Sequence, residues 1–480
     1  MARPPQKYIV AAAFVAAMFL NILDATIVNV ALPSIADAFG AEATKTEWVV
    51  LGYLLSLAVF IPASGWIGDR FGSKRTFLVA VALFTAASAL CGMAGSLEQL
   101  IAFRLLQGMG GGMLMPVGTA MLFRAFPPAE RAAASRIIIV PTVIAPASGP
   151  VIGGLLLDSL SWRWIFLVNV PIGLAVVVAG ALLLEEHHEA RAGRFDLAGF
   201  VLSGAGLALT LYAISRGADV GWASPVILAT GLGGLAVIAT LVVVELRAPE
   251  PMLHLRLFED RLFRATNVAC FFGFGAFLAM LFSISLFVQS GQGLSPLDAG
   301  LATFPEAVGV LIGAQVAGRL YARVGPRRLM TFGLGLLSAM LLALSRLGFD
   351  TSLVAIGALL AVGGFGMGSV FMPLQAATFA RISQADMGRA SALYNTQRQT
   401  AGAVGVAVVA TVLSSLAVGP LSASPGAFHA AFLAAAAMAA VGAVVAVLIG
   451  MPRVSSSIRS GAMPLAASRR NASTISVRPA

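Results

Sequence analysis

The chain has 480 residues, of which 59% are hydrophobic and only 11% are charged. A soluble domain carries about 25% charged residues, so this composition excludes a soluble globular protein and predicts an integral membrane protein. The formal net charge of +10 does not indicate a nucleic-acid partner, because the basic residues gather in loops between apolar stretches. The two cysteines, Cys91 and Cys270, lie inside apolar stretches and predict neither a disulfide framework nor a metal site.

Apolar stretches of roughly the 20 residues that cross a bilayer recur along the chain and predict about fourteen spans. They cover residues 8–32, 48–67, 76–95, 99–123, 134–157, 164–184, 197–215, 223–245, 265–288, 299–321, 329–347, 352–373, 391–416 and 428–450. The first stretch follows Arg3 and Lys7 and superficially resembles a signal peptide. It is too long for one and contains Asn21, Asp24 and Asn29, so we expect it to be retained as the first span.

The distribution of lysine and arginine predicts the orientation. One set of alternate loops holds most of the basic residues, whereas the loops on the other side offer only Lys45, Arg163, Arg216 and Arg346. Because basic loops stay in the cytoplasm, both termini are expected there. The basic set comprises Arg70, Lys74, Arg75, Arg124, Arg131, Arg136, Arg191, Arg194, Arg247, Arg256, Arg261, Arg264, Arg323, Arg327, Arg328, Arg381 and Arg389.

The spans divide into two sets of six around a central pair, which predicts an all-α protein with two six-helix lobes and two inserted helices. The N-terminal lobe is predicted over 1–184, the linker with the inserted helices over 185–264, and the C-terminal lobe over 265–450. Residues 451–480 are rich in Ser, Ala and Arg and have no apolar period. They predict a disordered cytoplasmic tail.

A stretch rich in glycine and charge, residues 65–75, returns in weaker form at residues 318–328. At one constant offset, Gly65, Arg70, Gly72, Lys74 and Arg75 recur as Gly318, Arg323, Gly325, Arg327 and Arg328, whereas Asp69 becomes Ala322. This indicates an internal duplication, which is typical of secondary transporters. We expect both copies to be loops in which glycines let the neighbouring spans turn tightly.

Four further stretches accompany this pattern, namely 23–33 in the first span, 104–110 in the fourth, 149–154 in the fifth and 395–402 in the thirteenth. In order and placement the five stretches resemble the major facilitator superfamily, specifically its fourteen-span drug:proton antiporter branch. The resemblance implies the major facilitator fold and a multidrug efflux transporter of the cell inner membrane that confers antibiotic resistance. It also implies alternating access driven by the proton gradient, without a cofactor. The match departs at Ala145, where the family has glycine.

Asp24 and Arg104 are the first candidates for proton coupling. A charged side chain at the centre of a membrane helix costs about 2.5–3.5 kcal/mol on insertion scales, so we expect both residues to have a structural or functional role. Counting 1.5 Å per residue places Asp24 about 13 Å and Arg104 about 8 Å from the outer end of its span. The two side chains could therefore pair or share a cavity, and Asp24 would carry the proton. The alternative interpretation is a fixed salt bridge between the first and fourth spans.

Glu306 is a second carboxylate inside a predicted span, about 10 Å from its outer end. It is a candidate for a second proton site or for a counter-charge to cationic substrates. The alternative is a locally paired or partly exposed glutamate. The remaining candidates for the substrate cavity are polar or flexible residues of the predicted spans, namely Asn21, Gln107, Met115, Gln375, Asn395 and Arg398. Arg398 is expected either to line the inner cavity or to extend toward the cytoplasmic interface.

Two motifs are expected to serve the conformational change. Gly149, Pro150, Gly153 and Gly154 predict a bendable fifth span, with ordinary tight packing as the alternative. Asp69 is expected at the positive N-terminal end of a helix in the other lobe, near residues 388–391, where a carboxylate is favoured. The resemblance implies that this contact latches the lobes in the outward-open state.

The sequence thus predicts a proton-coupled exporter of hydrophobic or cationic drug-like compounds. The alternative is an exporter of an endogenous lipid or secondary metabolite with the same fold. No ATP-binding loop, zinc signature or reactive triad is evident in the sequence, so a pump driven by ATP or a membrane enzyme is not predicted. We expect the lipid bilayer, a small substrate and protons as partners, no nucleic acid, and a functional monomer.

Overall fold

A computed structural model describes residues 5–41, 43–127, 130–187, 194–417, 422 and 424–448. Within these ranges the chain forms helices joined by short connections, without a β-strand. These residues belong to one compact unit. The predicted disordered tail, 451–480, lies outside the described residues.

Every predicted span corresponds to a helix. Thirteen helices of the described part are long and apolar enough to cross a membrane, and α6 is a further helix of 29 residues with several side chains outside the described set. They are α1 (Gln6–Phe39), α3 (Trp48–Phe71), α4 (Ser73–Gly92), α5 (Leu97–Ala125), α6 (Arg131–Ser159), the four-residue α7 (Trp164–Leu167) with α8 (Asn169–Leu183) as one span, α9 (Leu197–Val220), α10 (Pro225–Arg247), α11 (Arg261–Leu286), α12 (Pro296–Val324), α13 (Pro326–Leu344), α14 (Leu353–Thr378), α15 (Met387–Leu416) and α16 (Pro425–Leu448). Short elements complete the order: α2 (Ala43–Thr46), the 3₁₀-helix η2 (Leu255–Glu259) and the π-helical turn η3 (Phe287–Gly291).

The expectation that residues 65–75 form a loop is wrong. Helix α3 continues to Phe71 and α4 begins at Ser73, so Gly72 alone makes the connection. Gly72 has a φ of 97°, a conformation that glycine adopts without the steric cost of a side chain. Gly325, with a φ of 82°, makes the same connection between α12 and α13. The charged residues of each copy therefore flank a one-residue turn at a helix junction.

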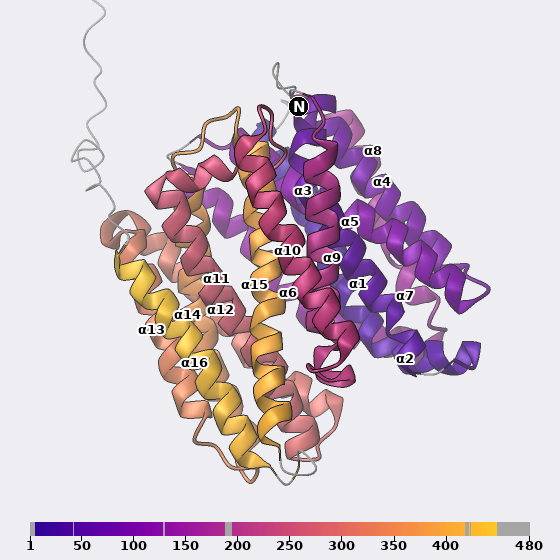
Figure 1. Cartoon of the computed structure of the whole chain (residues 1–480), viewed down its shortest axis with the longest axis vertical. Coiled ribbons are helices and arrows are strands. Elements are labelled where there is room, and N and C mark those ends of the chain that lie inside the picture. The colour runs from indigo at the N-terminus through magenta and orange to yellow at the C-terminus, as the bar shows by residue number, and fades with distance from the viewer. Residues whose placement is uncertain are drawn as a thin grey trace, which may run out of the picture. The chain divides into compact units, whose positions relative to one another are not determined.

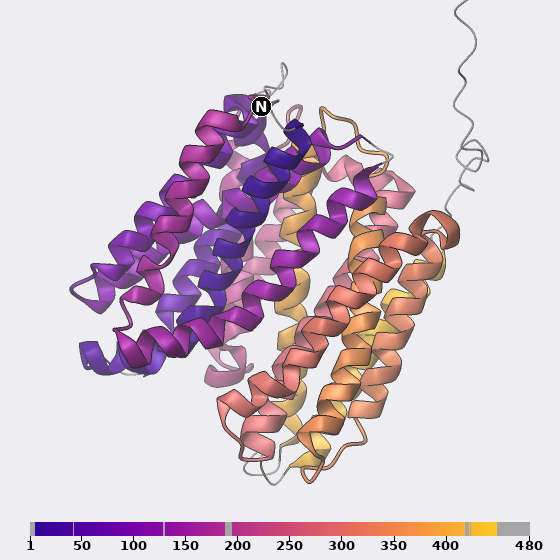
Figure 2. The same ribbon diagram turned by 180° about the vertical axis from the view of Figure 1, so that it is seen from behind.

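The helices form two halves with the same packing pattern. In the N half, α1–α8, the closest neighbours are α3 with α5, α4 with α5, α1 with α6, and α4 with α8. In the C half, α11–α16, they are α12 with α14, α13 with α14, α11 with α15, and α13 with α16. The two halves lie side by side in Figure 2. The inserted pair, α9 and α10, packs on itself and through α9 on α3.

Glycines hold the second and fourth helices of each half at backbone contact. A Cβ on Gly108 or Gly112 of α5 would collide with the carbonyl oxygen of Tyr53 or Leu57 on α3. In the C half, Gly364 and Gly368 of α14 face the carbonyl oxygens of Glu306 and Val310 on α12 in the same way. Tyr53 and Leu57 are related to Glu306 and Val310 by the same offset that relates Gly65 to Gly318. The duplication therefore extends from the motif to the helix packing.

The two halves meet along α3 and α15, α6 and α12, α5 and α15, and α6 and α14. We call the basic end the end of the bundle where Arg70, Lys74, Arg75, Arg124 and Arg323 lie. The chain begins at this end, marked N in Figure 1. Figure 2 shows the ribbons of the two halves close together at the basic end and farther apart at the opposite end.

Candidate functional site

A buried ion pair joins α1 to α5 inside the N half. The Arg104 guanidinium donates to Asp24 Oδ2 at 2.6 Å, and both residues are completely buried. Arg104 also donates through Nε to the carbonyl oxygen of Val49 at 2.9 Å. The guanidinium lies over the Tyr53 ring, 4.1 Å from its centroid. The expected proximity of Asp24 and Arg104 is therefore present as a direct contact.

Two amides complete the surroundings of Asp24. Gln107 Nε2 donates to Asp24 Oδ1 at 2.8 Å, and its Oε1 accepts from Arg104 at 2.8 Å. Asn169 Nδ2 of α8 also donates to Asp24 Oδ1, at 3.0 Å. Every one of these contacts brings a donor to Asp24, which matches an ionised carboxylate that can only accept. A proton added to Asp24 would therefore cost at least one of these hydrogen bonds.

Sequence reasoning did not select Asn169 or its partner Ser88. Asn169 Nδ2 lies 3.1 Å from Ser88 Oγ, which itself donates to the carbonyl oxygen of Phe166 at 2.8 Å. A signal was present, because Asn169 and Ser88 are polar residues in otherwise apolar stretches. It was weak, because a single amide or hydroxyl in a membrane helix is often satisfied by its own helix backbone. Only the packing of α8 against α4 and α1 brings Asn169 to Asp24.

The other cavity candidates of the N half lie close to this cluster. Asn21 is buried one turn before Asp24 and donates to the Tyr53 hydroxyl at 3.0 Å. Met115 is buried on α5, two turns beyond Gln107. Asn21 therefore joins the Asp24 cluster through Tyr53, whereas Met115 belongs to the apolar continuation of α5.

Glu306 lies in the C half, where no described residue forms a hydrogen bond or ion pair with it. Its side chain is buried, with 7% of its surface exposed, and Oε1 makes no hydrogen bond within the described structure. The expected alternative of a locally paired glutamate finds no partner among the described residues. Counting along α12 and α1 places Glu306 and Asp24 each about 27 Å from the basic end. The two carboxylates thus occupy similar depths in different halves.

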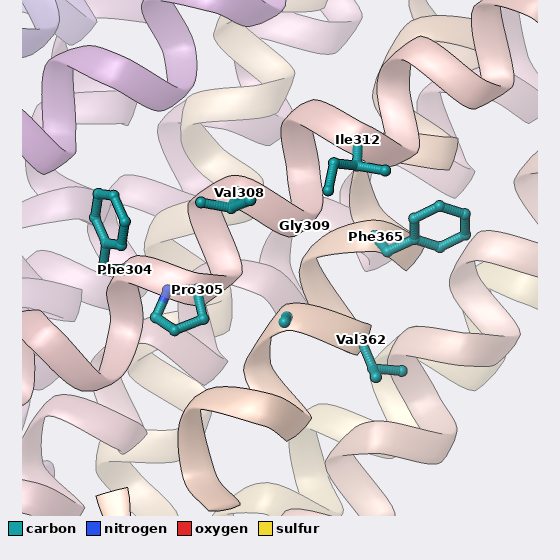
Figure 3. A pocket seen from close by; sticks show the side chains of 8 residues that line it. Phe304, Pro305, Val308, Gly309, Ile312, Val362 and Phe365 are labelled. Atoms are coloured by element: carbon teal, nitrogen blue, oxygen red, sulfur yellow. The ribbon is translucent and has the colours of Figure 1, made fainter. Parts of the chain in front are cut away.

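Glu306 does not line the apolar groove that lies beside it. This groove, between α12 and α14, has a volume of about 480 Å³, and Figure 3 shows Phe304, Pro305, Val308, Gly309, Ile312, Val362 and Phe365 around it. The equivalent helices of the N half, α3 and α5, form a similar groove of about 620 Å³. Because several lining side chains are large, apolar and exposed, these grooves suit lipid tails rather than the charged groups of the interior.

The remaining candidates of the C half are on α14 and α15. Asn395 is buried and donates to the carbonyl oxygen of Ser391 on its own helix, at 2.9 Å. Gln375 is partly exposed in the last turn of α14. Arg398 is partly exposed, and its guanidinium lies 5.1 Å from the centroid of the Phe274 ring on α11. No hydrogen bond among the described residues joins these three side chains into one cluster.

Asp69 lies where the two halves touch at the basic end. It accepts from Arg124 at 2.7 Å, and Arg124 also donates to Ser73 Oγ at 2.8 Å and to the carbonyl oxygen of Gln384 at 3.2 Å. A Cβ on Gly388, in the first turn of α15, would approach Asp69 Oδ1 at 2.7 Å. The expected placement of Asp69 at a helix N-terminus of the other half is thus observed. Arg70 and Arg75 are exposed, and Lys74 donates to the carbonyl oxygen of Ala181.

Further contacts close the basic end. The Phe123 and Phe379 rings stack with their centroids 4.8 Å apart, Ser391 Oγ donates to the carbonyl oxygen of Pro116 at 2.7 Å, and Arg131 donates to the carbonyl oxygen of Phe379. Gly65 packs here too, because a Cβ at this position would meet the Gly388 carbonyl oxygen at 2.8 Å. Gly65 therefore serves close contact between the halves and not the turn expected from the sequence.

The glycines of α6 differ in their surroundings. A Cβ on Gly149 would collide with Thr26 on α1, and one on Gly153 would meet Ile27 Cγ1 at 3.1 Å, whereas Gly154 has nothing within 4 Å. Helix α6 is continuous from Arg131 to Ser159. Pro150 lies within it, at a position whose side chain is outside the described set. Gly149 and Gly153 thus serve the tight packing that was the alternative interpretation, and bending of this helix stays a prediction.

A family model described as Major Facilitator Superfamily matches residues 14–406. The chain belongs to this superfamily. It is 33% identical over 402 residues to the multidrug resistance protein B homolog of Mycobacterium tuberculosis, covering 82% of this chain and 73% of that protein. It is 32% identical over 400 residues to the uncharacterized MFS-type transporter YhcA of Bacillus subtilis, covering 83% and 75%. To the putative multidrug resistance protein MdtD of Salmonella heidelberg it is 35% identical over 347 residues, covering 72% and 73%.

A solved structure supports the fold. The human organic anion transporter MFSD10 (TETRAN) superposes with a TM-score of 0.67 at 17% identity, over 92% of this chain and 100% of that one. As a member of the major facilitator superfamily, the protein is a multi-pass transporter of the cell membrane and not an enzyme. In the described part of the chain, no cluster of three or more His, Cys, Asp or Glu residues could hold a metal ion.

Proposed function

We propose that this major facilitator transporter exports hydrophobic or cationic drug-like compounds in exchange for protons. The observation that carries the proposal is the completely buried Asp24–Arg104 pair, in which Gln107 and Asn169 also donate to the carboxylate. Relatives named as multidrug resistance proteins support the substrate class. The lipid bilayer surrounds the protein, the proton gradient supplies the energy without a cofactor, and one chain suffices for transport.

Protonation of Asp24 would change what holds α1 to α5 and α8. An ionised Asp24 accepts from three side chains, whereas a neutral carboxyl presents a donor and releases Arg104 from its counter-ion. Arg104 would then keep its hydrogen bonds to Gln107 and the Val49 carbonyl, on α5 and α3, and its place over the Tyr53 ring. The proton thus alters contacts between helices of the N half, which gives coupling a physical route.

The positive-inside rule places the basic end in the cytoplasm. With the contacts around Asp69, Arg124 and Gly388 in place, the observed arrangement would be closed toward the cytoplasm and ready to take a proton from outside. Rocking of the two halves would then expose Asp24 and the substrate site to the other side. Each charge that crosses supplies about 2.3 kcal/mol per 100 mV, and a pH gradient adds about 1.4 kcal/mol per unit.

Glu306 would contribute a negative charge in the C half. It lacks a counter-ion among the described residues, so a cationic substrate or a second proton would neutralise it. A second candidate function, export of an endogenous lipid or metabolite, is favoured by the apolar groove one residue away at Pro305. Efflux of a cationic dye by membrane vesicles, compared with movement of a labelled lipid between leaflets, would separate the two.

The central experiment uses Asp24→Asn in energised inside-out vesicles. We expect proton-coupled uptake of a cationic dye such as ethidium to be abolished, because the amide cannot carry the proton. Asn21→Asp in an Asp24→Asn background is a matched control, since it restores a carboxylate one turn away but not its contact with Arg104. Unchanged dye transport by folded Asp24→Asn protein would refute coupling at this residue.

A further inference from the structure

Arg398 is a positive charge inside the predicted thirteenth span, and no counter-ion lies beside it among the described residues. Its Nε atom is buried and makes no hydrogen bond, and no carboxylate among the described side chains pairs with it. Arg104, the buried arginine of the N half, differs because it is paired with Asp24. Glu306, which also lacks a partner among the described residues, lies on α12, whose main neighbour is α14.

The position of the guanidinium shows that the Arg398 side chain does not extend to the basic end of the bundle. Arg398 lies eleven residues into α15, so its Cα is about 16 Å from the basic end of the helix. Its guanidinium lies over the Phe274 ring, which is thirteen residues into α11. The charge therefore stays at the depth of its own Cα or deeper. Of the two expectations for Arg398, reaching the interface does not match this geometry.

The Phe274 ring that contacts the charge belongs to a small aromatic cluster. Phe274 contacts the Phe371 ring of α14 at 5.9 Å between centroids, and Phe371 contacts Phe277 at 5.8 Å. One turn before Arg398, the Tyr394 hydroxyl lies 3.8 Å from Cys270 Sγ. The guanidinium thus adjoins a cluster of rings drawn from α11 and α14, with an apolar face that could take a planar group.

The residues around Arg398 are polar and partly exposed. Thr396, Gln397, Arg398, Gln399 and Thr400 are all partly exposed, and consecutive residues point to all sides of a helix. Such a run cannot face hydrocarbon, because polar groups at this depth are tolerated only inside protein or beside water. Three buried polar atoms here have no hydrogen-bond partner within the described part of the chain, namely Thr396 Oγ1, Gln397 Oε1 and Asn267 Oδ1 of α11.

We propose that Arg398 binds the acidic group of an aromatic substrate, with the ring of the substrate against Phe274 and Phe371. A guanidinium offers parallel donors that match a carboxylate or sulfonate, and it does so without losing its charge. The free oxygens of Gln397 and Asn267 would accept from a hydroxyl or amide N–H of the same compound. This inference rests on the proposed export function and extends its substrates from cationic and neutral compounds to aromatic acids.

Three naphthalene compounds test the proposal, because they share one ring system and differ in charge: 2-naphthoate, 2-naphthylmethanol and 2-naphthylmethylammonium. Binding to the purified full-length protein in lipid nanodiscs is measured by calorimetry. We expect the wild type to bind naphthoate at least tenfold more tightly than the alcohol. Arg398→Gln should lose this preference and leave the affinity for the alcohol and the ammonium compound within twofold. Arg398→Lys should keep part of it, since the charge remains but the planar fork is lost.

Gln399→Ala is the matched control, one residue along the same helix, and should bind all three compounds like the wild type. Two results would overturn the proposal: a wild type that does not prefer naphthoate, or an Arg398→Gln protein that loses all three compounds equally. Failure of the export function has a different signature. It would appear as absence of ethidium transport by the wild type in vesicles, whereas the naphthoate preference is measured without a gradient.

Discussion

At the scale of single residues, the Asp24–Arg104 pair carries both a structural and a functional role. Removing one member of a buried pair leaves an uncompensated charge, which lowers the free energy of unfolding by about 3–5 kcal/mol. The pair also determines whether α1 is tied to α5. To decide between a fixed salt bridge and a proton carrier, both stability and proton coupling must therefore be measured in more than one variant.

A double-mutant cycle separates the two roles. Arg104→Gln alone should lower the apparent melting temperature in detergent, because Asp24 loses its counter-ion in a completely buried site. Asp24→Asn combined with Arg104→Gln should regain most of that loss, since two neutral amides can bond with each other and with Gln107. The double variant should still show no proton-coupled transport. Recovery of both stability and coupling would identify the pair as a structural bridge only.

Asp24 and Arg104 could be identified from the sequence because membrane helices seldom contain charged residues. Their depths were estimated by counting residues. Sequence reasoning did not identify Asn169, Ser88 or the Tyr53 ring, because the sequence does not show which helix a residue on α8, α4 or α3 faces. The same limit explains Arg398. Its depth was predicted, but that no described residue of the neighbouring helices pairs with it could be seen only in the structure.

At the scale of helices, the fourteen predicted spans all correspond to helices, and the errors lie at the ends. Hydropathy reports only the part of a helix that meets hydrocarbon, so α1 and α15 run several residues beyond their predicted limits. Residues 65–75 were predicted as a loop for the same reason, because charge ended the apolar stretch while the helix continued. The domain limits at 184 and 264 stay predictions.

The glycines that join helices give a prediction with an internal control. Gly364→Ala should lower the melting temperature by an amount that corresponds to about 1–3 kcal/mol, because its Cβ would collide with the backbone of Glu306. Gly154→Ala should be neutral or slightly stabilising, since nothing lies within 4 Å and alanine favours a helix. Thermal unfolding of both variants in the same detergent compares them. Equal melting temperatures would contradict the close backbone contact of α12 and α14 through Gly364.

The linker before α11 should make stability depend on pH through His254. Burial and the Arg389 guanidinium lower the pKa of His254 below its ordinary value of 6.5; Arg256 acts in the same direction and Asp386 opposes it. The Arg389 guanidinium lies 3.5 Å from His254 Nε2. Below pH 6.5 the unfolded chain therefore binds a proton that the folded protein still excludes, so stability falls as the pH falls toward the lowered pKa.

His254→Gln should flatten this dependence between about pH 7 and 5, because glutamine does not titrate there. The measurement is the apparent melting temperature at half-unit pH intervals, relative to the wild type. Arg389→Gln should keep a smaller slope, since burial still lowers the pKa of His254. A His254→Gln profile as steep as that of the wild type would assign the dependence to other groups.

At the scale of the whole molecule, transport requires the contacts between the halves at the basic end to break and form again. Arg124 is central there, because it bonds Asp69 and Ser73 in the N half and the Gln384 carbonyl in the C half. The duplicated motif has Ala322 in place of Asp69, so the acid at this junction belongs to one half only. The closed arrangement therefore depends on one asymmetric set of contacts.

Asp69→Asn should slow turnover several-fold while leaving the proton affinity of the protein unchanged, because Asp69 is far along α3 from the Asp24 cluster. The rate of dye transport in vesicles gives the first quantity, and proton release on addition of dye to purified protein gives the second. Ala322→Asp is the companion variant, which tests whether an acid at the second junction changes the rate. Wild-type turnover by Asp69→Asn would reduce the motif to a topological signal.

The glycine contacts between the second and fourth helices of each half have a consequence for how the side chains of such a protein can change in evolution. Tyr53 and Glu306 hold equivalent places in the two halves, and in both it is the main-chain carbonyl that contacts a glycine of the neighbouring helix. Because the backbone makes the contact, the side chain at that place can be a phenol over an arginine in one half and an acid without a described partner in the other. A gene duplication that secured the scaffold through glycines would thus leave its ligand-facing chemistry open to independent selection.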